Sequence, residues 1–577
     1  MRIRHDRRFS GYYAPMALSS PASLFRRVFD PRYGPRGRLV SRWIFVRALA
    51  LIYFSAFFSL LFQVKGLIGP NGVLPAQQYL AAVAHSVHGI ERYWLAPSLF
   101  WISASSHAVM IVTWIGLVAS IVAFFNVWPR MCFFICWACF LAFVTASGDF
   151  SMYQSDGMLL EAGFIALFFV PSGLLPGWGV GTPPSRASLF LLQWEWFRIY
   201  FESGMVKLLS GDTEWRNLTA MDEYYQNGPL PTWIGWYAEH LPHWFHVASA
   251  AGTFVMELVI VLMLFFPRRV RIICFFIVTP WEIGVILTAN YTFLNYLVLS
   301  LGLLLLDDRS LLWLVPGRFR PPIEPDSVEA PRRAEEGLSI LSPASSDAVP
   351  EPEEVEEEIA SRKSLRNRLG GHWSAIRLAF AAILLTWIAY DTTAEMIRLP
   401  VRSVPLPTTP IALLEPFRIA NQYGLFAVMT RGRYEIEFQG SNDGENWTPY
   451  PFRYKPQALN EAPGIYAPYQ PRFDWNLWFA SLGDWRQSNI VPLTEERLLA
   501  NDKDVLGLFR GNPFKNAPPH FVRAVLWQYW FTSADEKRRT GNWWRRELLG
   551  MYAPELTLTS EGKFAVVQWP EELPEHD

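Results

Sequence analysis

The chain has 577 residues, of which 51% are hydrophobic, 16% aromatic and only 18% charged. In soluble proteins about a quarter of all residues are usually charged, so this composition indicates a large membrane part. The formal net charge is −1, and no excess of basic residues points to nucleic acid. We therefore expect membrane lipids, and no nucleic acid, among the partners.

The first 42 residues form a basic arm with ten arginines. Its first apolar run, "WIFVRALALIYFSAFFSLLFQV" (43–64), begins too late for a cleavable signal peptide and is long enough to be a first membrane span. We expect residues 1–42 to be an irregular cytoplasmic arm.

Eight further apolar runs approach the roughly 20 residues that cross a bilayer as a helix. The sequence therefore predicts a polytopic α-helical membrane bundle of about nine spans. Eight spans fall within residues 43–315 and the last within 371–396. The runs after the first lie at about 107–125, 131–148, 157–175, 188–206, 248–266, 272–289, 291–306 and 373–390.

Lysine and arginine placement sets the predicted orientation. With the basic arm in the cytoplasm, nine spans also place "PRRVR" (267–271) and the segment near 309–370 there. The loops at 65–106 and 207–247 and the C-terminal domain fall on the opposite side. We expect a multi-pass protein with a lumenal or periplasmic C-terminal domain. Its membrane would be that of the endoplasmic reticulum in a eukaryote or the inner (plasma) membrane in a bacterium.

Residues 316–370 are rich in Pro, Glu and Ser and poor in apolar residues, which predicts a disordered acidic cytoplasmic linker. Residues 397–577 are instead predicted to form a folded, exported domain. In "RYEIEFQGSNDGENWTPYPFRY" (433–454), apolar and polar residues alternate on either side of Asn442-Asp443-Gly444, a hairpin turn signal. "RFDWNLWFASL" (472–482) and "ERLLANDKDVLGLF" (496–509) have helical patterns. We expect a mixed, β-rich domain with a β-sandwich-like core.

Ionisable residues at membrane depth are the main candidate site, because charges near hydrocarbon are costly and face the protein interior. Glu195, Arg198 and Glu202 follow i, i+3, i+7 spacing and share one helix face. They are either structural ion pairs between helices or the lining of a functional cavity. The other members of this predicted polar cluster are Arg47, Asp156, Glu161, Glu257 and Glu282.

Lys207 follows the same helix but points well over 100° away from the Glu195 face. A desolvated lysine loses its proton more easily and can act as a base. The alternative is a lysine that snorkels to the outer interface.

Two other groups resemble metal-binding patterns. Cys132, Cys136 and Cys139 share a helix face, but no His or carboxylate accompanies them, so we interpret them as packing residues of a span. His240, His243 and His246 fit an interfacial loop with aromatic neighbours. We assign no metal site and no cofactor.

Long motifs resemble the lipase maturation factor family. The main one is "YFESGMVKLLSGDTEWRNLTAMDEYYQNGPLPTWIGWYAEHLP" (200–242). Others are "GPNGVLPAQQYL" (69–80), "YQSDGMLLEAGFIALFF" (153–169) and "NYTFLNYLVLSLGLLLLDD" (290–308). In the C-terminal domain, "EPFRIANQYGLFAVMTRGRYEIEFQGSNDGENW" (415–447), "YQPRFDWNLWFASLG" (469–483) and "GNPFKNAPPHFVRAVLWQYWFT" (511–532) are similar.

The resemblance implies a non-enzymatic, chaperone-like membrane protein that assists the maturation of secreted proteins such as lipases. Its vertebrate members reside in the endoplasmic reticulum, and the lumenal C-terminal domain is the expected client-handling part. Secreted client proteins, lipases among them, are therefore the expected partners. The residues within the matched motifs of that domain are Phe417, Arg418, Asn421, Tyr423 and Trp475.

A second resemblance concerns Lys207. "YFESGMVKL" (200–208) is similar to a helix-end pattern that supplies a catalytic lysine base in vitamin K-dependent gamma-carboxylases. This implies an alternative function, a membrane enzyme that uses Lys207 as a base on a quinone-like or lipidic substrate. Transport is a third alternative, suggested by the charged spans, but no inverted repeat supports it.

Overall fold

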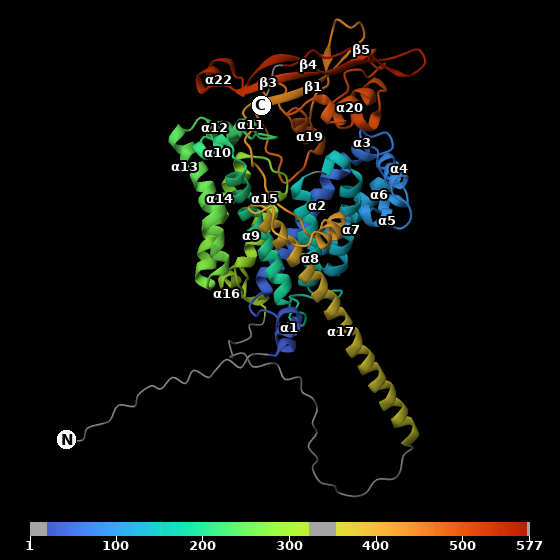
Figure 1. Ribbon diagram of the computed structural model, residues 1–577, viewed down its shortest axis with the longest axis vertical. Coiled ribbons are helices and arrows are strands. Elements are labelled where there is room, and N and C mark those ends of the chain that lie inside the picture. The colour runs from blue at the N-terminus through green and yellow to red at the C-terminus, as the bar shows by residue number, and fades with distance from the viewer. Residues whose placement is uncertain (1–19, 152, 322–352, 574–577) are drawn as a thin grey trace, which may run out of the picture.

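The computed structural model describes residues 20–151, 153–321 and 353–573. A helical bundle occupies one end of the molecule and a β-sheet with short helices the other (Figure 1). Residues 1–19 of the predicted arm and 322–352 of the predicted linker lie outside the described residues. We expected the whole arm to be irregular, but part of it forms helix α1 (Pro21–Phe29).

Six helices of the described chain are long and apolar enough to cross a membrane. Lengths of 18 to 27 residues fit the thickness of a bilayer. The protein is therefore an integral membrane protein. The six are α2 (Leu39–Leu61), α6 (Ser106–Phe124), α7 (Pro129–Ala146), the run His243–Phe265, α14 (Arg268–Thr288), and His372–Arg398 of α17 (Glu353–Arg398).

The predicted count of about nine spans is not confirmed. Helix α8 (Gln154–Phe169) has 16 residues, and α15 with η6 covers only Leu294–Leu305. Helix α9 (Arg186–Leu209) has 24 residues but contains several charged side chains. Length and hydropathy define a span in contact with lipid, whereas most residues of α8 and α9 are buried among other helices.

Short helices connect these elements or cover their ends. Helix α17 is described from Glu353, so its backbone includes the last part of the segment for which we expected a linker. The run His243–Phe265 consists of α13 (His243–Phe254), η4 (Val255–Val259) and η5 (Ile260–Phe265). The short helices are α3 (Val64–Ile68), α4 (Ala76–Ser86), α5 (Glu91–Leu95), α10 (Thr213–Asn217), α11 (Tyr224–Asn227), α12 (Trp233–Glu239), α15 (Leu294–Gly302), α16 (Asp308–Leu311) and α18 (Thr409–Leu414).

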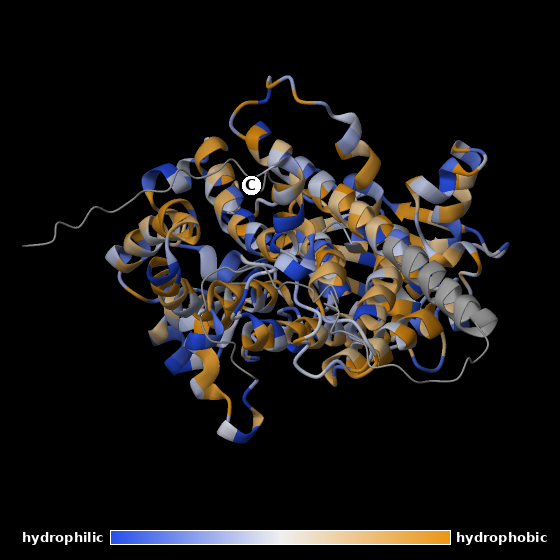
Figure 2. Cartoon of the chain, turned by 90° about the horizontal axis from the view of Figure 1, so that it is seen from below, coloured by the Kyte–Doolittle hydropathy of each residue, from blue (hydrophilic) through white to orange (hydrophobic). Residues whose placement is uncertain are grey.

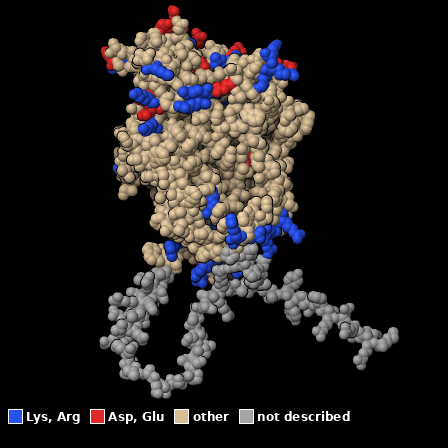
Figure 3. All heavy atoms as spheres, turned by 180° about the vertical axis from the view of Figure 1, so that it is seen from behind, with Lys and Arg blue, Asp and Glu red and all other residues tan. Residues whose placement is uncertain are grey.

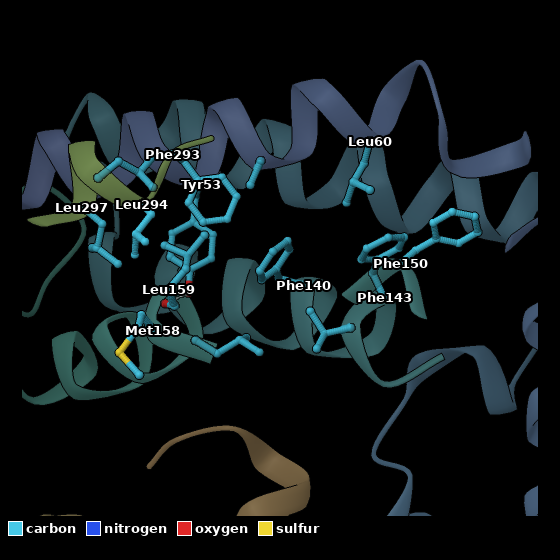
Figure 4. Close-up of a cluster of buried hydrophobic side chains, with 14 of the residues drawn as sticks. Tyr53, Leu60, Phe140, Phe143, Phe150, Met158, Leu159, Phe293, Leu294 and Leu297 are labelled. Carbon is cyan, nitrogen blue, oxygen red and sulfur yellow. Dashed lines mark hydrogen bonds between the residues drawn. The ribbon is translucent and has the colours of Figure 1, made fainter. Parts of the chain in front are cut away.

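Aromatic and aliphatic side chains from four helices fill the centre of the bundle (Figure 4). Tyr53 of α2 lies against Phe140 of α7 with ring centroids 6.2 Å apart. Its hydroxyl donates a hydrogen bond to the carbonyl oxygen of Leu159 in α8 at 3.0 Å. Phe293 and Leu297 beside α8 are fully buried. This packing fixes the position of α8, which carries two of the predicted site carboxylates.

The outer surface of the bundle suits a bilayer. Seen from below, the helices carry hydrophobic residues on outward as well as inward sides (Figure 2). Lys and Arg gather near the two ends of the face seen in Figure 3, with few charges between them. Exposed residues such as Leu51, Ile111, Phe276 and Phe380 would meet lipid chains.

The C-terminal domain contains one antiparallel sheet of five strands in the order β2-β1-β3-β4-β5. The predicted hairpin is confirmed, since β1 pairs with β2 around the Asn442-Asp443-Gly444 turn. The β-sandwich-like core is wrong: helices, and no second sheet among the described residues, cover one face. The strands are β1 (Arg433–Ser441), β2 (Thr448–Pro449), β3 (Phe521–Phe531), β4 (Trp544–Leu558) and β5 (Phe564–Gln568).

Helices α19 (Arg472–Ala480), α20 (Ile490–Leu499) and α21 (Lys503–Leu506) lie between the sheet and the bundle (Figure 1). They confirm the two predicted helical segments. Ile436 and Phe438 of β1 and Leu477 of α19 share the same apolar core. Strand β3 continues through α22 (Ala534–Thr540) to β4. The alternation in β1 predicted its strand, but not whether a sheet or helices would cover it.

Candidate functional site: the connecting segment and its socket

The chain between α18 and β1, residues 415–431, has no regular structure beyond the 3-10 turn Glu415–Phe417. We call it the connecting segment. It lies beside α8 and α9, and several of its backbone groups hydrogen-bond to side chains of these helices. Irregular backbone is tolerated at membrane depth only where the protein satisfies those groups.

Buried side chains of α8 and α9 (Glu161, Arg198 and Glu202) bind this segment, and we call them the socket. Arg198 is its centre. It is fully buried and forms an ion pair with Glu161 of α8. Its Nη1 atom donates a hydrogen bond to the carbonyl oxygen of Asn421 at 2.6 Å and lies 3.8 Å from Oε1 of Glu202. The predicted pairing on the α9 face is therefore present, and it extends to a second helix and to the connecting segment.

The carboxylates accept hydrogen bonds from backbone amides of the connecting segment. The amide of Asn421 donates to Oε2 of Glu161 at 2.9 Å, and that of Tyr423 donates to Oε2 of Glu202 at 2.6 Å. The Asn421 side chain also donates to the carbonyl oxygen of Gly157 at 3.0 Å. These charges at membrane depth therefore have a structural task, to satisfy an irregular backbone.

Glu195 lies on the same helix face and is fully buried. Among the described residues its carboxylate forms no ion pair within 4 Å. Glu161 and Glu202 bring two carboxyl groups to the single guanidinium of Arg198, and Glu195 adds a third buried carboxyl group on the same helix face. The socket is thus richer in acidic groups than one arginine can neutralise.

The socket continues toward the sheet domain. The amide of Met429 donates to Oδ2 of Asp212 at 2.7 Å, and the indole of Trp215 donates to the carbonyl oxygen of Phe426 at 2.8 Å. Asn227 donates to the carbonyl oxygen of Thr430 at 2.8 Å. Loop residues of the long motif at 200–242 therefore hold the segment up to the start of β1.

A second buried pair joins α19 of the C-terminal domain to α8. Both guanidinium nitrogens of Arg472 bind Asp156, at 2.7 and 2.8 Å, and both side chains are fully buried. Gln63 accepts from the amide of Arg472 at 2.8 Å and donates to the carbonyl oxygen of Gln470 at 2.9 Å. The sequence predicted Asp156 as a site residue, but not Arg472 or Gln63. An arginine inside the apolar motif "YQPRFDWNLWF" was the available signal.

Lys207 does not snorkel to the interface. Its ammonium group is 4% exposed and lies 2.8 and 2.9 Å from the two oxygens of Glu257. It also donates to Oγ of Ser203 at 2.7 Å and lies 5.3 Å from the ring centroid of Trp215. All three ammonium protons thus have acceptors, an arrangement that stabilises a charged lysine.

Two predicted members lie apart from the socket. Glu282 accepts a hydrogen bond from the hydroxyl of Tyr200 at 2.6 Å. Arg47 stacks on Trp43, with its guanidinium carbon 3.7 Å from the ring centroid. The nine predicted residues therefore form separate units: the Arg198 socket, the pairs at Asp156 and Lys207, the Glu282 contact, and isolated Arg47.

Two family models match this chain. The lipase maturation factor transmembrane domain matches residues 40–313, and the lipase maturation factor C-terminal domain matches residues 419–554. The chain belongs to the lipase maturation factor family. The connecting segment from residue 419 onward falls in the family's C-terminal domain, whereas its socket falls in the transmembrane domain. The site described above is therefore the junction of the two parts of a lipase maturation factor.

Vertebrate relatives match along nearly their whole length. Lipase maturation factor 2 of Gallus gallus is 29% identical, with 92% of this chain and 84% of the relative covered. Lipase maturation factor 1 of Mus musculus is 29% identical, with 97% and 95% covered. No solved structure matches the chain.

The motif residues of the C-terminal domain lie at this junction of the lipase maturation factor. Phe417 packs edge-on against Trp94, with ring centroids 4.7 Å apart. Asn421 and Tyr423 lie in the socket, and Trp475 is buried in α19 beside Tyr153. Arg418 is exposed. A client-handling role for these five remains a prediction.

The remaining motif residues make contacts within the protein. Cys132, Cys136 and Cys139 are buried as free thiols in α7. His243 pairs with Asp222 at 2.9 Å. His240 and His246 hydrogen-bond to backbone carbonyls. In the described part of the chain, no group of three or more His, Cys, Asp or Glu has the geometry of a metal site.

Proposed function

We propose that this protein is a membrane-anchored maturation factor that assists the folding of exported proteins, with lipases as the first clients to test. The match to both domains of the lipase maturation factor family carries the proposal. The junction geometry supports it, because it holds the sheet domain in a defined position above the bundle (Figure 1).

We place the sheet domain on the exported side and the N-terminus in the cytoplasm. Helices α1 and α16 lie at the end of the bundle opposite the sheet (Figure 1), and they contain arginines, among them Arg27 and Arg309. This arrangement follows the preference of basic residues for the cytoplasmic side. The membrane is that of the endoplasmic reticulum in a eukaryote and the inner membrane in a bacterium.

The edge strand β5 is the best candidate surface for clients. Its sequence "FAVVQ" contains no charged residue, and Phe564, Val566 and Val567 are 40–50% exposed. It pairs on one side with β4 and stands at the end of the strand order. Uncharged edge strands are templates for pairing with another chain, so an extended segment of an unfolded client would pair here.

Deletion of the gene, followed by measurement of the secreted proteome, tests the function. We expect at least one secreted enzyme to lose activity or solubility, and no such loss would contradict the proposal. A double variant Val566→Lys/Val567→Lys tests the client surface, because lysines block edge pairing. Leu548→Lys on β4, where Leu548 is 50% exposed, is the matched control. Equal rescue by both variants would remove β5 from the proposal.

No feature of the described residues favours the carboxylase-like alternative. Lys207 is engaged with Glu257 and Ser203, and the matched family models and reported relatives are those of lipase maturation factors.

A further inference from the structure

A lateral groove of about 680 Å³ opens on the side of the bundle, bordered by α2, α14, α15 with η6, and a loop of the C-terminal domain. Its volume lies within the roughly 300–1,000 Å³ of sites for small ligands. Phe54 and Phe58 of α2, Leu299 of α15 and Leu303 of η6 form much of its wall. The socket and the Lys207 pair contribute none of its lining.

Three of the hydroxyl groups in the wall are used within the protein. The hydroxyl of Ser55 donates to the carbonyl oxygen of Pro468 at 2.8 Å, and that of Tyr296 donates to the carbonyl oxygen of Ala467 at 3.1 Å. Ser300 donates to the carbonyl oxygen of Leu297 at 2.8 Å within its own helix. The groove therefore offers an occupant an apolar surface, which suits a hydrocarbon chain.

The exported end of the groove is closed by a fixed loop. Oδ1 of Asn290 accepts hydrogen bonds from the amides of Tyr466 and Ala467 at 2.7 and 3.1 Å. Its Nδ2 donates to the carbonyl oxygen of Gly464 at 2.9 Å. Tyr466 and Tyr469 thus form an aromatic roof held by both parts of the protein. Tyrosines at such a level are typical of the headgroup region of a bilayer.

The surroundings of the groove indicate its occupant. Helices α2 and α14 are long and apolar enough to span the membrane, and beside the groove Leu51 is 52% and Phe276 64% exposed. The groove therefore opens toward lipid. A helix of a second copy would pack through small residues that let two backbones approach. The wall contains small residues such as Ala48 and Ser55, but the rings of Phe54 and Phe58 on the same helix would keep a second backbone at a distance.

We propose that the lateral groove binds one acyl chain of a membrane glycerophospholipid, with the headgroup beside the Tyr466–Tyr469 roof. The bound chain contacts helices of the membrane part and the loop of the C-terminal domain at once. Since it binds only when both surfaces are in place, it stabilises their docked arrangement by mass action.

Photo-crosslinking in nanodiscs tests this site. The full-length protein is reconstituted in phosphatidylcholine that contains a fraction of phosphatidylcholine with a diazirine on one acyl chain. After irradiation, mass spectrometry of peptides maps the labelled residues. We expect labels on Phe54, Phe58 and Leu303 at least fivefold above those on Phe276, which faces lipid outside the groove.

Variants that fill the groove provide the control. Thr279→Trp places a large ring in the groove from α14, and we expect it to reduce labelling at Phe54 and Leu303 at least fivefold. Ile273→Trp lies on another face of the same helix, where Ile273 is 52% exposed, and should leave labelling unchanged. Leu299→Trp fills the groove from the opposite wall if Thr279→Trp does not fold.

Three results would overturn the proposal. The first is wild-type labelling at groove residues no greater than at Phe276. The second is labelling by a free diazirine fatty acid but not by the phospholipid, and the third is a crosslink between two copies through the groove.

Discussion

Arg198 and Lys207 are both buried cations of helix α9, yet their surroundings differ. Arg198 binds carboxylates and also the irregular backbone of the connecting segment. Lys207 binds one carboxylate and one hydroxyl, all from neighbouring helical segments. A buried cation beside an irregular backbone thus binds backbone groups as well as carboxylates. A buried cation that is surrounded by helices forms an ion pair with a single carboxylate.

Loss of the socket arginine should give the largest effect. Arg198→Met leaves Glu161 and Glu202 without a counter-charge and removes the donor to the carbonyl oxygen of Asn421. Breaking one side of a buried pair costs about 3–5 kcal/mol. We expect a loss of that size in the free energy of unfolding, measured in detergent by tryptophan fluorescence. Arg47→Met is the matched control, because Arg47 is partly exposed and contacts only Trp43 of its own helix, through the ring and the carbonyl oxygen. A loss below about 1 kcal/mol in Arg198→Met would contradict the socket.

Removal of Lys207 should cost less stability, and a second substitution at Glu257 should restore most of it. Lys207→Met leaves Glu257 without its partner and should cost about 2–4 kcal/mol. The double variant Lys207→Met/Glu257→Met should recover most of this loss, because no unpaired charge remains. In contrast, Arg198→Met/Glu161→Met should not recover, since the amide and carbonyl of Asn421 lose their partners. Equal recovery in both double variants would remove the distinction between socket and pair.

The Lys207 double variant also tests the enzymatic alternative. If it is stable and supports client secretion, Lys207 does not act as a base. A stable double variant that no longer supports secretion would reopen that alternative.

Two glycines test the same two sites by space instead of charge. A Cβ atom at Gly157 would lie 2.8 Å from Oδ1 and 3.0 Å from Cγ of Asn421. A Cβ at Gly204, beside the Lys207 pair, would lie 2.7 Å from Cδ2 of Leu258. Overpacking costs about 1–3 kcal/mol where the neighbour is fixed. We expect both Gly157→Ala and Gly204→Ala to lose stability in this range, because hydrogen bonds hold the Asn421 side chain and the Cβ of Glu257, 3.0 Å from a Cβ at Gly204, does not move with a rotamer. An unchanged thermal unfolding temperature for Gly157→Ala would contradict the close packing of the connecting segment against α8.

The smallest effect concerns a carboxylate in the sheet domain that binds backbone amides without an arginine. Asp474 accepts from the amides of Tyr454 and Lys455, both at 3.2 Å. Burial raises the pKa of Asp474 from 3.8 to about 6, although these hydrogen bonds oppose the shift. The folded form therefore holds its proton more tightly than the unfolded form, and its stabilising contribution is lost as pH rises from about 4 to about 6.

Asp474→Asn keeps an oxygen acceptor for both amides and removes the titration. We expect the variant to be more stable than the wild type by about 1 kcal/mol at pH 7 and indistinguishable from it near pH 4. Unfolding of the full-length protein between pH 4 and pH 7 measures this difference. A wild-type advantage that grows with pH would show that the charged form is the favoured one.

Much of the helical architecture was predictable because apolar runs and charge spacing are local signals. The shared face of Glu195, Arg198 and Glu202 follows from helix geometry alone. Their main partners did not, because backbone amides more than 200 residues away have no signature in a sequence. The sequence does not decide whether Lys207 is buried or lies at the interface for a similar reason. Whether Glu257 faces it depends on how two helices pack.

The β-sandwich error has a different origin. Alternation in β1 marks a strand with two distinct faces, and one face indeed packs against the apolar core. The opposite face is also buried, with Glu435 bound to Lys455. Alternation cannot tell whether a sheet, a helix or a polar loop covers a face. The count of about nine spans stays unconfirmed, because α8 and α15 are apolar but short.

The connecting segment also constrains the order of biogenesis. Helices α8 and α9 are synthesised first, but the backbone groups that complete their socket belong to residues 421–424. The ion pairs of Arg198 can form early, but their backbone partners await the last third of the chain, and Asp156 awaits Arg472. The bundle consequently reaches its final packing only after translation has passed these residues. A chain truncated before residue 415 would leave Glu161 and Glu202 without these backbone donors.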